Sequence, residues 1–137
     1  MVVIGGRAPD GKSGLTASQL EIYDPVEDAW SLRDDIAMEA GRFSFCAVPL
    51  NSSSFMVLGG WGSSGLPLAS VEILNLDTGS WRPGPELPRP RYGQTCLLTE
   101  IAGRQGVMVV GGALSGECLG LAVIMLQMTL ISKMEEF

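Results

Sequence analysis

Residues 13–30 read SGLTASQLEIYDPVEDAW, and residues 64–81 read SGLPLASVEILNLDTGSW. Aligned without a gap at an offset of 51 residues, the two stretches share Ser, Gly, Leu, Glu, Ile and Trp in register. Similar residues fill three further positions: Leu20/Val71, Tyr23/Leu74 and Asp24/Asn75. The chain therefore contains an internal repeat, and the repeat decides the fold because each copy should form the same small unit.

Two shorter signals extend the repeat. Three apolar runs end in paired glycines, in steps of 54 and 52 residues, at Gly5-Gly6, Gly59-Gly60 and Gly111-Gly112. An arginine with an aromatic residue after it precedes the last two pairs, as Arg42-Phe43-Ser44 and Arg91-Tyr92-Gly93. Because these features recur in one order, we predict units of roughly 50 residues.

The second unit contains four short β-rich runs separated by turn residues. We expect its strands at residues 43–49, 55–58, 70–75 and 80–83. No segment of useful length shows the helical period of 3.6 residues. Four strands in roughly 50 residues form the antiparallel meander of a propeller blade, so the predicted fold class is all-β.

The repeated residues have predicted structural roles. The glycine pairs mark sharp turns where a strand ends, since glycine alone reaches positive φ at low cost. We expect Tyr23, Trp30 and Trp81 to pack between strands and against the next blade. Arg42 and Arg91 begin inner strands at equivalent places, and we expect them to form structural hydrogen bonds.

These ordered signals resemble the kelch family, whose repeat joins a strand ending in Gly-Gly, a Tyr-Asp strand and a Trp strand. The resemblance covers residues 1 to about 116 and rests on Gly5, Gly6, Tyr23, Trp30, Gly59, Gly60, Trp81, Gly111 and Gly112. It implies a β-propeller, most often of six blades, that acts as a non-enzymatic interaction module. Many members are substrate-recognition adaptors of cullin-type ubiquitin ligases, and others bind actin or act as scaffolds. The implied partner is another protein of unknown identity, with cullin-ligase machinery reached through domains outside this chain.

Against this pattern the chain divides into four stretches. Residues 1–41 make a blade without its first strand, 42–90 a complete blade, 91–118 a partial third blade, and 119–137 an atypical apolar tail. Residues 121–127 are expected to supply a third strand to the third blade. Propellers need at least four blades, so we predict an incomplete ring. We also expect a fragment of a larger protein, whose bare blade faces lead to association or aggregation.

Composition excludes several classes of function. The net charge is −6 without a clustered basic stripe, which argues against binding to nucleic acid or to an anionic membrane. The chain has no histidine, so no copper or zinc centre and no other cofactor are expected. The three cysteines, Cys46, Cys96 and Cys118, lack the close spacings of metal or redox motifs. We expect them to be reduced apolar fillers in a cytoplasmic protein, and no signal peptide is visible.

One motif favours a different function. Residues 6–13, GRAPDGKS, satisfy the phosphate-binding loop pattern, in which Lys12 would contact phosphates and Ser13 would hold Mg²⁺. That loop needs a helix directly after it, whereas the repeat predicts a strand over residues 15–23. We therefore interpret the motif as a glycine-rich loop between strands. An enzyme remains the alternative only if its catalytic residues lie outside this chain.

The candidate binding residues follow from blade geometry. In a four-stranded meander, the loop from the second to the third strand and the link between blades emerge on one face. The loops are residues 7–16, 61–68 and 113–118, and the links are residues 32–41 and 82–90. Binding residues concentrate on loops held by a rigid scaffold, and Arg and Trp dominate interface hot spots. The candidates are therefore Arg7, Lys12, Trp61 and Arg82.

Overall fold

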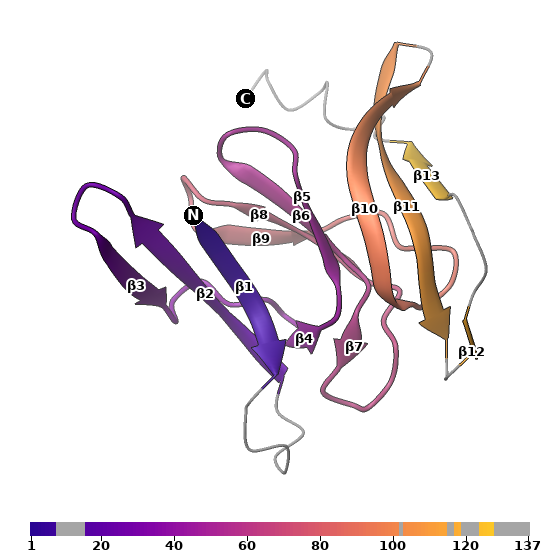
Figure 1. Ribbon diagram of the computed structural model, residues 1–137, viewed down its shortest axis with the longest axis horizontal. Helices are drawn as coiled ribbons and strands as arrows, with labels where there is room; N and C mark the ends of the chain where they lie inside the picture. Colours follow the sequence, from indigo (N-terminus) through magenta and orange to yellow (C-terminus); the bar gives the residue numbers. More distant parts are fainter. Residues whose placement is uncertain (8–15, 102, 115–116, 119–123, 128–137) are drawn as a thin grey trace.

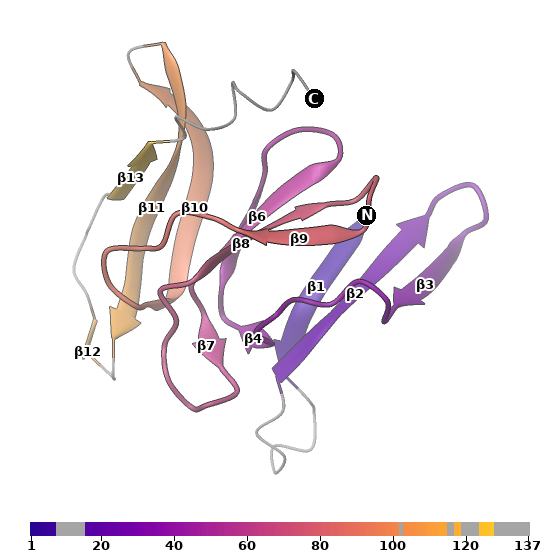
Figure 2. The ribbon, with the colours of Figure 1, turned by 180° about the vertical axis from the view of Figure 1, so that it is seen from behind.

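The computed structural model describes residues 1–7, 16–101, 103–114, 117–118 and 124–127, whose regular structure is entirely β-strand. The strands form three larger antiparallel sheets and one two-stranded sheet. Figures 1 and 2 show the larger sheets side by side, with the second in chain order between the other two. The predicted all-β fold is confirmed, and the sheets fit blades of an incomplete propeller because they do not close into a ring. The described part of the chain offers no helix that would cross a membrane.

Blade 1 is a three-stranded sheet. It contains β1 (Val2–Arg7), β2 (Thr16–Asp24) and β3 (Ala29–Arg33) in that spatial order. The strand predicted at residues 15–23 is β2, so the described residues that follow the motif form a strand where a phosphate-binding loop requires a helix. Residues 8–15, which include Lys12 and Ser13, lie outside the described residues.

Blade 2 is a complete meander. It contains β5 (Cys46–Pro49), β6 (Ser54–Leu58), β8 (Val71–Asn75) and β9 (Ser80–Pro83), and neighbours in this order are hydrogen-bonded. The strands coincide with the runs predicted from the sequence, apart from the first one. Because blade 2 lies between two other sheets, both faces of β6 and β8 are buried, and their residues are mostly apolar without strict alternation.

The run predicted as one strand over residues 43–49 is divided. Its beginning belongs to β4 (Arg42–Phe43), which pairs with β7 (Trp61–Gly62) in a separate two-stranded sheet. Ser44 has φ of 51°, a left-handed conformation that interrupts the extended backbone before β5. The prediction of a continuous strand was wrong here, because nothing in the residue itself signals positive φ.

Blade 3 contains the two longest strands, β10 (Tyr92–Ile101) and β11 (Arg104–Leu114). The short strands β12 (Glu117–Cys118) and β13 (Ile124–Gln127) both pair antiparallel with β11. The strand predicted within residues 121–127 is present over its last four residues, and residues 119–123 lie outside the described residues.

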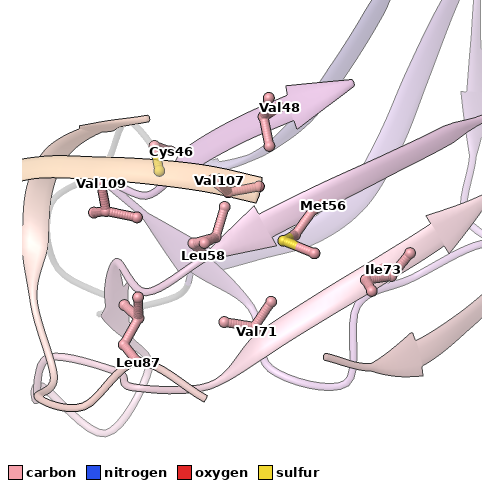
Figure 3. Close-up of a cluster of buried hydrophobic side chains, with 9 residues drawn as sticks. All are labelled: Cys46, Val48, Met56, Leu58, Val71, Ile73, Leu87, Val107 and Val109. Carbon is pink, nitrogen blue, oxygen red and sulfur yellow. The ribbon is translucent and has the colours of Figure 1, made fainter. Parts of the chain in front are cut away.

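The larger core lies between blades 2 and 3. Side chains from the blade-2 strands face those of β10 and β11, and Figure 3 shows the buried members of this cluster. They are Cys46, Val48, Met56, Leu58, Val71, Ile73, Leu87, Val107 and Val109. Burial of such side chains is the main favourable contribution to folding, so the contact between blades stabilises both sheets.

A second core joins blades 1 and 2. Leu20 on β2 and Leu74 on β8 are both fully buried there. Trp81 packs against the same cluster, so it lies on the side of blade 2 that faces the preceding blade and not the next one as predicted. Trp30 differs from its expected role, because half of its side-chain surface (49%) is exposed. Its ring packs on Tyr23 at a centroid distance of 5.3 Å. The described residues place no blade on that side of blade 1, so Trp30 has no neighbouring sheet to cover it.

The prediction that each glycine pair ends a strand holds only for Gly59 and Gly60, which follow β6; the other two pairs lie within β1 and β11. The first two pairs also have a role in packing. A Cβ on Gly5 would lie 2.8 Å from the backbone oxygen of Arg42, and one on Gly59 would lie 2.6 Å from that of Arg91. Both glycines have positive φ, at 66° and 59°. Gly5 and Gly59 therefore let a blade approach the backbone of the next one closely, whereas a Cβ on Gly111 would have no neighbour within 4 Å.

The cysteine prediction was wrong for two of the three residues. Cys46 on β5 and Cys96 on β10 form a disulfide, with their Cα atoms 5.9 Å apart. Cys46 pairs with Leu58 and Cys96 with Val109, so the two sulfurs lie on the facing sides of blades 2 and 3. They are 50 residues apart in sequence, and only the stacking of blades brings them together.

Candidate protein-binding face

One edge of the molecule gathers the ends of several strands. Figures 1 and 2 show the end of β1, the β4–β7 pair and β12 along the lower edge, while the β2–β3 and β10–β11 hairpin tips lie at the opposite edge. The links from blade 1 to β4 and from blade 2 to β10 also reach this lower edge. We call it the loop face. It corresponds to the face chosen from blade geometry.

An aromatic row crosses the loop face, and it consists of Arg7, Phe43, Trp61 and Tyr92. The Arg7 guanidinium lies 5.6 Å from the centroid of the Phe43 ring, within the range of a cation–π contact. Phe43 pairs in register with Trp61, whose ring meets Tyr92 edge-on at 4.8 Å. The row therefore joins blade 1, the β4–β7 pair and blade 3 into one surface.

Backbone contacts fix the row between blades 2 and 3. The Gly60 amide donates to the backbone oxygen of Arg91 at 2.8 Å, and the Gly93 amide donates to that of Ser44 at 2.7 Å. Gly60 has φ of 98°, and a Cβ there would lie 2.9 Å from the Phe43 oxygen. Only glycine fits this position, which carries Trp61 onto the loop face.

A buried ion pair fixes β4, the strand that carries Phe43 of the row. Arg42 is fully buried and donates to the Glu72 carboxylate, to the Ser70 hydroxyl and to backbone oxygens including that of Gly59 at 3.0 Å. Glu72 also accepts from the Glu39 amide at 2.9 Å. Burial lowers the pKa of Arg42, and the adjacent carboxylate opposes that shift. The structural hydrogen-bonding role predicted for Arg42 is confirmed.

Arg91 occupies the same place in blade 3 with a smaller set of partners. Its side chain is 2% exposed and donates to the Gly111 oxygen at 2.8 Å, which matches the contact from Arg42 to Gly59. The register position of Glu72 is taken by Ile124, because Val57 faces Glu72 and Val109 faces Ile124. Burial, and then the nearby Arg89, lower the pKa of Arg91.

The structure brings together two of the four predicted binding residues. Arg7 and Trp61 both lie in the aromatic row, and Arg7 is exposed. Lys12 lies outside the described residues. Arg82 lies within β9 opposite Ile73, in the outermost strand of the blade-2 sheet, so it is not part of the row. A binding role for any of the four stays a prediction.

Sequence reasoning missed Phe43 and Tyr92 as members of this surface. Both follow the repeated arginine, and both precede a residue with positive φ, Ser44 at 51° and Gly93 at 68°. The signal was present in the recurring Arg-aromatic pair. The sequence could not show that these aromatic residues share a surface, because the contact between Trp61 and Tyr92 depends on how the sheets pack.

The described residues contain no group of three or more acidic, cysteine or histidine side chains arranged to hold a metal ion. The loop face consists instead of aromatic rings and a cation on strand ends. Such a surface is suited to contact with another macromolecule, because rigid aromatic groups bury large areas at low entropic cost.

Comparison with known proteins agrees with this architecture. The family model described as Kelch motif matches residues 42–88, which cover blade 2 and the start of its link to blade 3. Human Kelch repeat and BTB domain-containing protein 12 is 33% identical over 128 residues, covering 85% of this chain and 20% of that protein. Human Kelch-like protein 34 is 29% identical over 124 residues, covering 85% of this chain and 18% of that protein.

A plant protein shows the same similarity. F-box/kelch-repeat protein OR23 of Arabidopsis thaliana is 30% identical over 109 residues, covering 72% of this chain and 25% of that protein. The chain thus spans about a fifth to a quarter of the length of these curated relatives. The repeat, the stacked antiparallel meanders and these matches together show that the chain belongs to the kelch-repeat family.

Proposed function

We propose that the loop face binds a protein partner and that the aromatic row makes the central contacts. The observation that carries this proposal is the continuity of the row, in which Arg7 contacts Phe43 and Trp61 contacts Tyr92. Phe43, Trp61 and Tyr92 are partly buried, so each ring is held in place yet offers a surface. Tyr, Trp and Arg are the residue types enriched at interface hot spots.

The row can be tested with two variants and a matched control. Proteins captured by the wild-type chain should be lost with Arg7→Glu, and also with Trp61→Ser, in quantitative mass spectrometry of pull-downs. Leu66→Ser is the control, because Leu66 lies in the loop after Trp61 and is 62% exposed outside the row. A partner that is retained by both row variants, with unchanged thermal stability, would contradict the proposal.

We further infer that the protein acts as a substrate-recognition adaptor of a cullin-type ubiquitin ligase. Support comes from the relatives, whose names combine kelch repeats with a BTB or an F-box domain. Those domains are the expected links to the ligase machinery. Recovery of the full-length reading frame tests this inference. The full-length frame should encode a BTB or F-box domain, and the full-length protein should co-precipitate a cullin. A frame without either domain would contradict the adaptor role.

We also propose that the protein lies in the cytoplasm, as such an adaptor would. Disulfides are rare in that compartment, so the Cys46–Cys96 bond weighs against this placement, and the redox state of the pair in cells tests it. Alkylation of living cells before lysis, followed by peptide mass spectrometry, measures this directly. A fully oxidised pair at that stage would argue for an oxidising compartment and against a cytoplasmic adaptor.

A further inference from the structure

The disulfide joins the two chain segments that also carry the aromatic row. Cys46 lies three residues after Phe43, and Cys96 lies four residues after Tyr92. The bond between their sulfurs sets the distance from the start of β5 to the middle of β10. The strands that the disulfide holds together are therefore continuous with the segments that place Phe43 and Tyr92 on the loop face.

One backbone hydrogen bond lies between the disulfide and the row. The Gly93 amide donates to the Ser44 oxygen at 2.7 Å, and in both segments these residues come after the aromatic residue and before the cysteine. Phe43 pairs in register with Trp61, whose ring meets Tyr92 at 4.8 Å. The disulfide, the hydrogen bond and the ring contact thus follow one another along the same junction, so the bond constrains the spacing of the rings.

The two cysteines also have a place in the core as free thiols. Cys46 belongs to the cluster between blades 2 and 3, with Val107 and Val109 (Figure 3), and Cys96 packs against that cluster. A thiol in such surroundings behaves as a small apolar side chain. The other members of the cluster are buried by blade packing and not by the sulfur–sulfur bond. The chain therefore has two folded states, which differ in one covalent link between blades.

Cys96 is the sulfur at which the bond is opened. It is partly exposed, whereas Cys46 is 8% exposed, so an incoming thiolate has its access on the side of Cys96. A first glutathione thiolate attacks Cys96 Sγ, forms a mixed disulfide and releases Cys46 as a thiolate that takes up a proton. A second glutathione attacks the glutathione sulfur of the mixed disulfide and releases Cys96. The products are two protein thiols and one oxidised glutathione, and the reverse sequence restores the bond.

We propose that the Cys46–Cys96 pair is a redox switch for the loop face, in which the disulfide holds the aromatic row in its binding arrangement and reduction loosens it. In the reduced state the contact between Trp61 and Tyr92 depends on noncovalent packing alone, so the rings lose order. Partner binding then weakens, because the rings have to be ordered again on association. This proposal rests on the binding role proposed for the loop face, and it does not depend on the cullin link.

The indole N–H signals of the tryptophans test the coupling without a partner. In nuclear magnetic resonance spectra of the oxidised and the glutathione-reduced chain, the signal of Trp61, assigned with Trp61→Phe, should shift or broaden on reduction. Trp30 is the internal control, because it lies in blade 1 against Tyr23, and its signal should stay in place. A Trp61 signal that is identical in both states, or an equal shift of Trp30, overturns the proposal.

Capture of partners in oxidised and in reduced glutathione tests the effect on binding. Proteins whose capture requires Trp61 should bind the reduced chain roughly tenfold more weakly, which corresponds to the cost of ordering one or two side chains on association. Cys46→Ser/Cys96→Ser should bind at the weaker level in both buffers. Cys118→Ser is the matched control, since Cys118 is not part of the disulfide, and this variant should respond to glutathione as the wild-type chain does.

The switch and the binding role fail in different ways. Partners that require Trp61 and bind the oxidised and reduced chains equally would overturn the switch and leave the binding role intact. If no captured protein depends on Trp61 in either buffer, the binding role of the loop face is wrong, and the switch proposal is overturned with it. A Cys46→Ser/Cys96→Ser variant that binds as tightly as the oxidised chain would also overturn the switch.

Discussion

At the scale of the residue, two ion pairs of the chain illustrate opposite energetic situations. Arg42 and Glu72 are almost fully buried, with 0% and 8% of their side-chain surfaces exposed, and each is the buried counterion of the other. Arg33 and Asp35 are 40% and 61% exposed, and they form a pair with both ends in water. Removing one partner should therefore have very different consequences in the two pairs.

Arg42→Met should lower the free energy of unfolding by about 3–5 kcal/mol, because it leaves the Glu72 carboxylate buried without its cation. Arg33→Met should leave the free energy of unfolding nearly unchanged, since exposed pairs contribute little. Urea unfolding of both variants, at one fixed protein concentration, measures the difference. Equal effects would mean that Arg42 does not hold the inner strand as described.

The sequence could predict the place of Arg42 but not its partner. The recurrence of arginine before an aromatic residue indicated a structural position in each inner strand. Glu72 lies 30 residues further along the chain, and its carboxylate meets Arg42 only after β8 has paired with β6. For the same reason the aromatic row was only half predicted, because Phe43 and Tyr92 acquire their neighbours from other strands.

At the scale of the element, the strand that ends in paired glycines has to satisfy two conditions. Gly59 must adopt positive φ, and it must also let the backbone oxygen of Arg91 approach. Gly65, in the loop that follows, has positive φ of 75° with nothing within 4 Å of a hypothetical Cβ. Substitutions at the two glycines therefore distinguish the cost of positive φ for a residue with a Cβ from the cost of blocking the approach of the next blade.

Gly65→Ala should cost about 1 kcal/mol, the usual penalty of a left-handed conformation for a residue with a Cβ. Gly59→Ala should cost roughly 2–4 kcal/mol, because the added methyl group also meets a backbone oxygen that cannot move aside. Thermal and urea unfolding check both values. If the two substitutions have the same effect, the first glycine of the pair serves only the turn.

The disulfide between β5 and β10 joins two elements that belong to different blades. Reduction should lower the melting temperature by roughly 15 °C, because about 4 kcal/mol of stabilisation is expected for a loop of this length. A variant with Cys46→Ser and Cys96→Ser should melt at the lower temperature with or without reductant. A melting temperature of the wild-type chain that does not respond to reductant would show that the bond is absent or that it adds no stability.

The strands of blade 2 could be predicted because each is a short β-rich run between turn residues. The break at Ser44 could not, because a serine gives no local indication of positive φ. The disulfide was also outside the reach of sequence spacing. The stacking of two sheets brings Cys46 and Cys96 together, and their separation of 50 residues along the chain does not indicate that contact.

At the scale of the whole molecule, the fold is a row of sheets that stabilise one another through their faces. Blade 2 has a buried core on each side, whereas blades 1 and 3 each have one covered side and one that is at least partly open. Stability should therefore be highest in β6 and β8 and lower toward both ends, as in other repeat proteins whose units contact only their neighbours. The repeat predicted this stacking of sheets. It did not predict which sides of blades 1 and 3 are covered and which are partly open.

The central claim is that successive meanders stack face to face, and contacts between methyl groups test it most directly. Nuclear Overhauser spectroscopy of methyl-labelled protein should show contacts from Leu20 to the Leu74 region, and from Leu58 and Val71 to Val109. These contacts link residues of different sheets and depend on both stacking interfaces at once. Methyl contacts confined to residues within one sheet would show that the blades do not pack on each other, and would contradict the account.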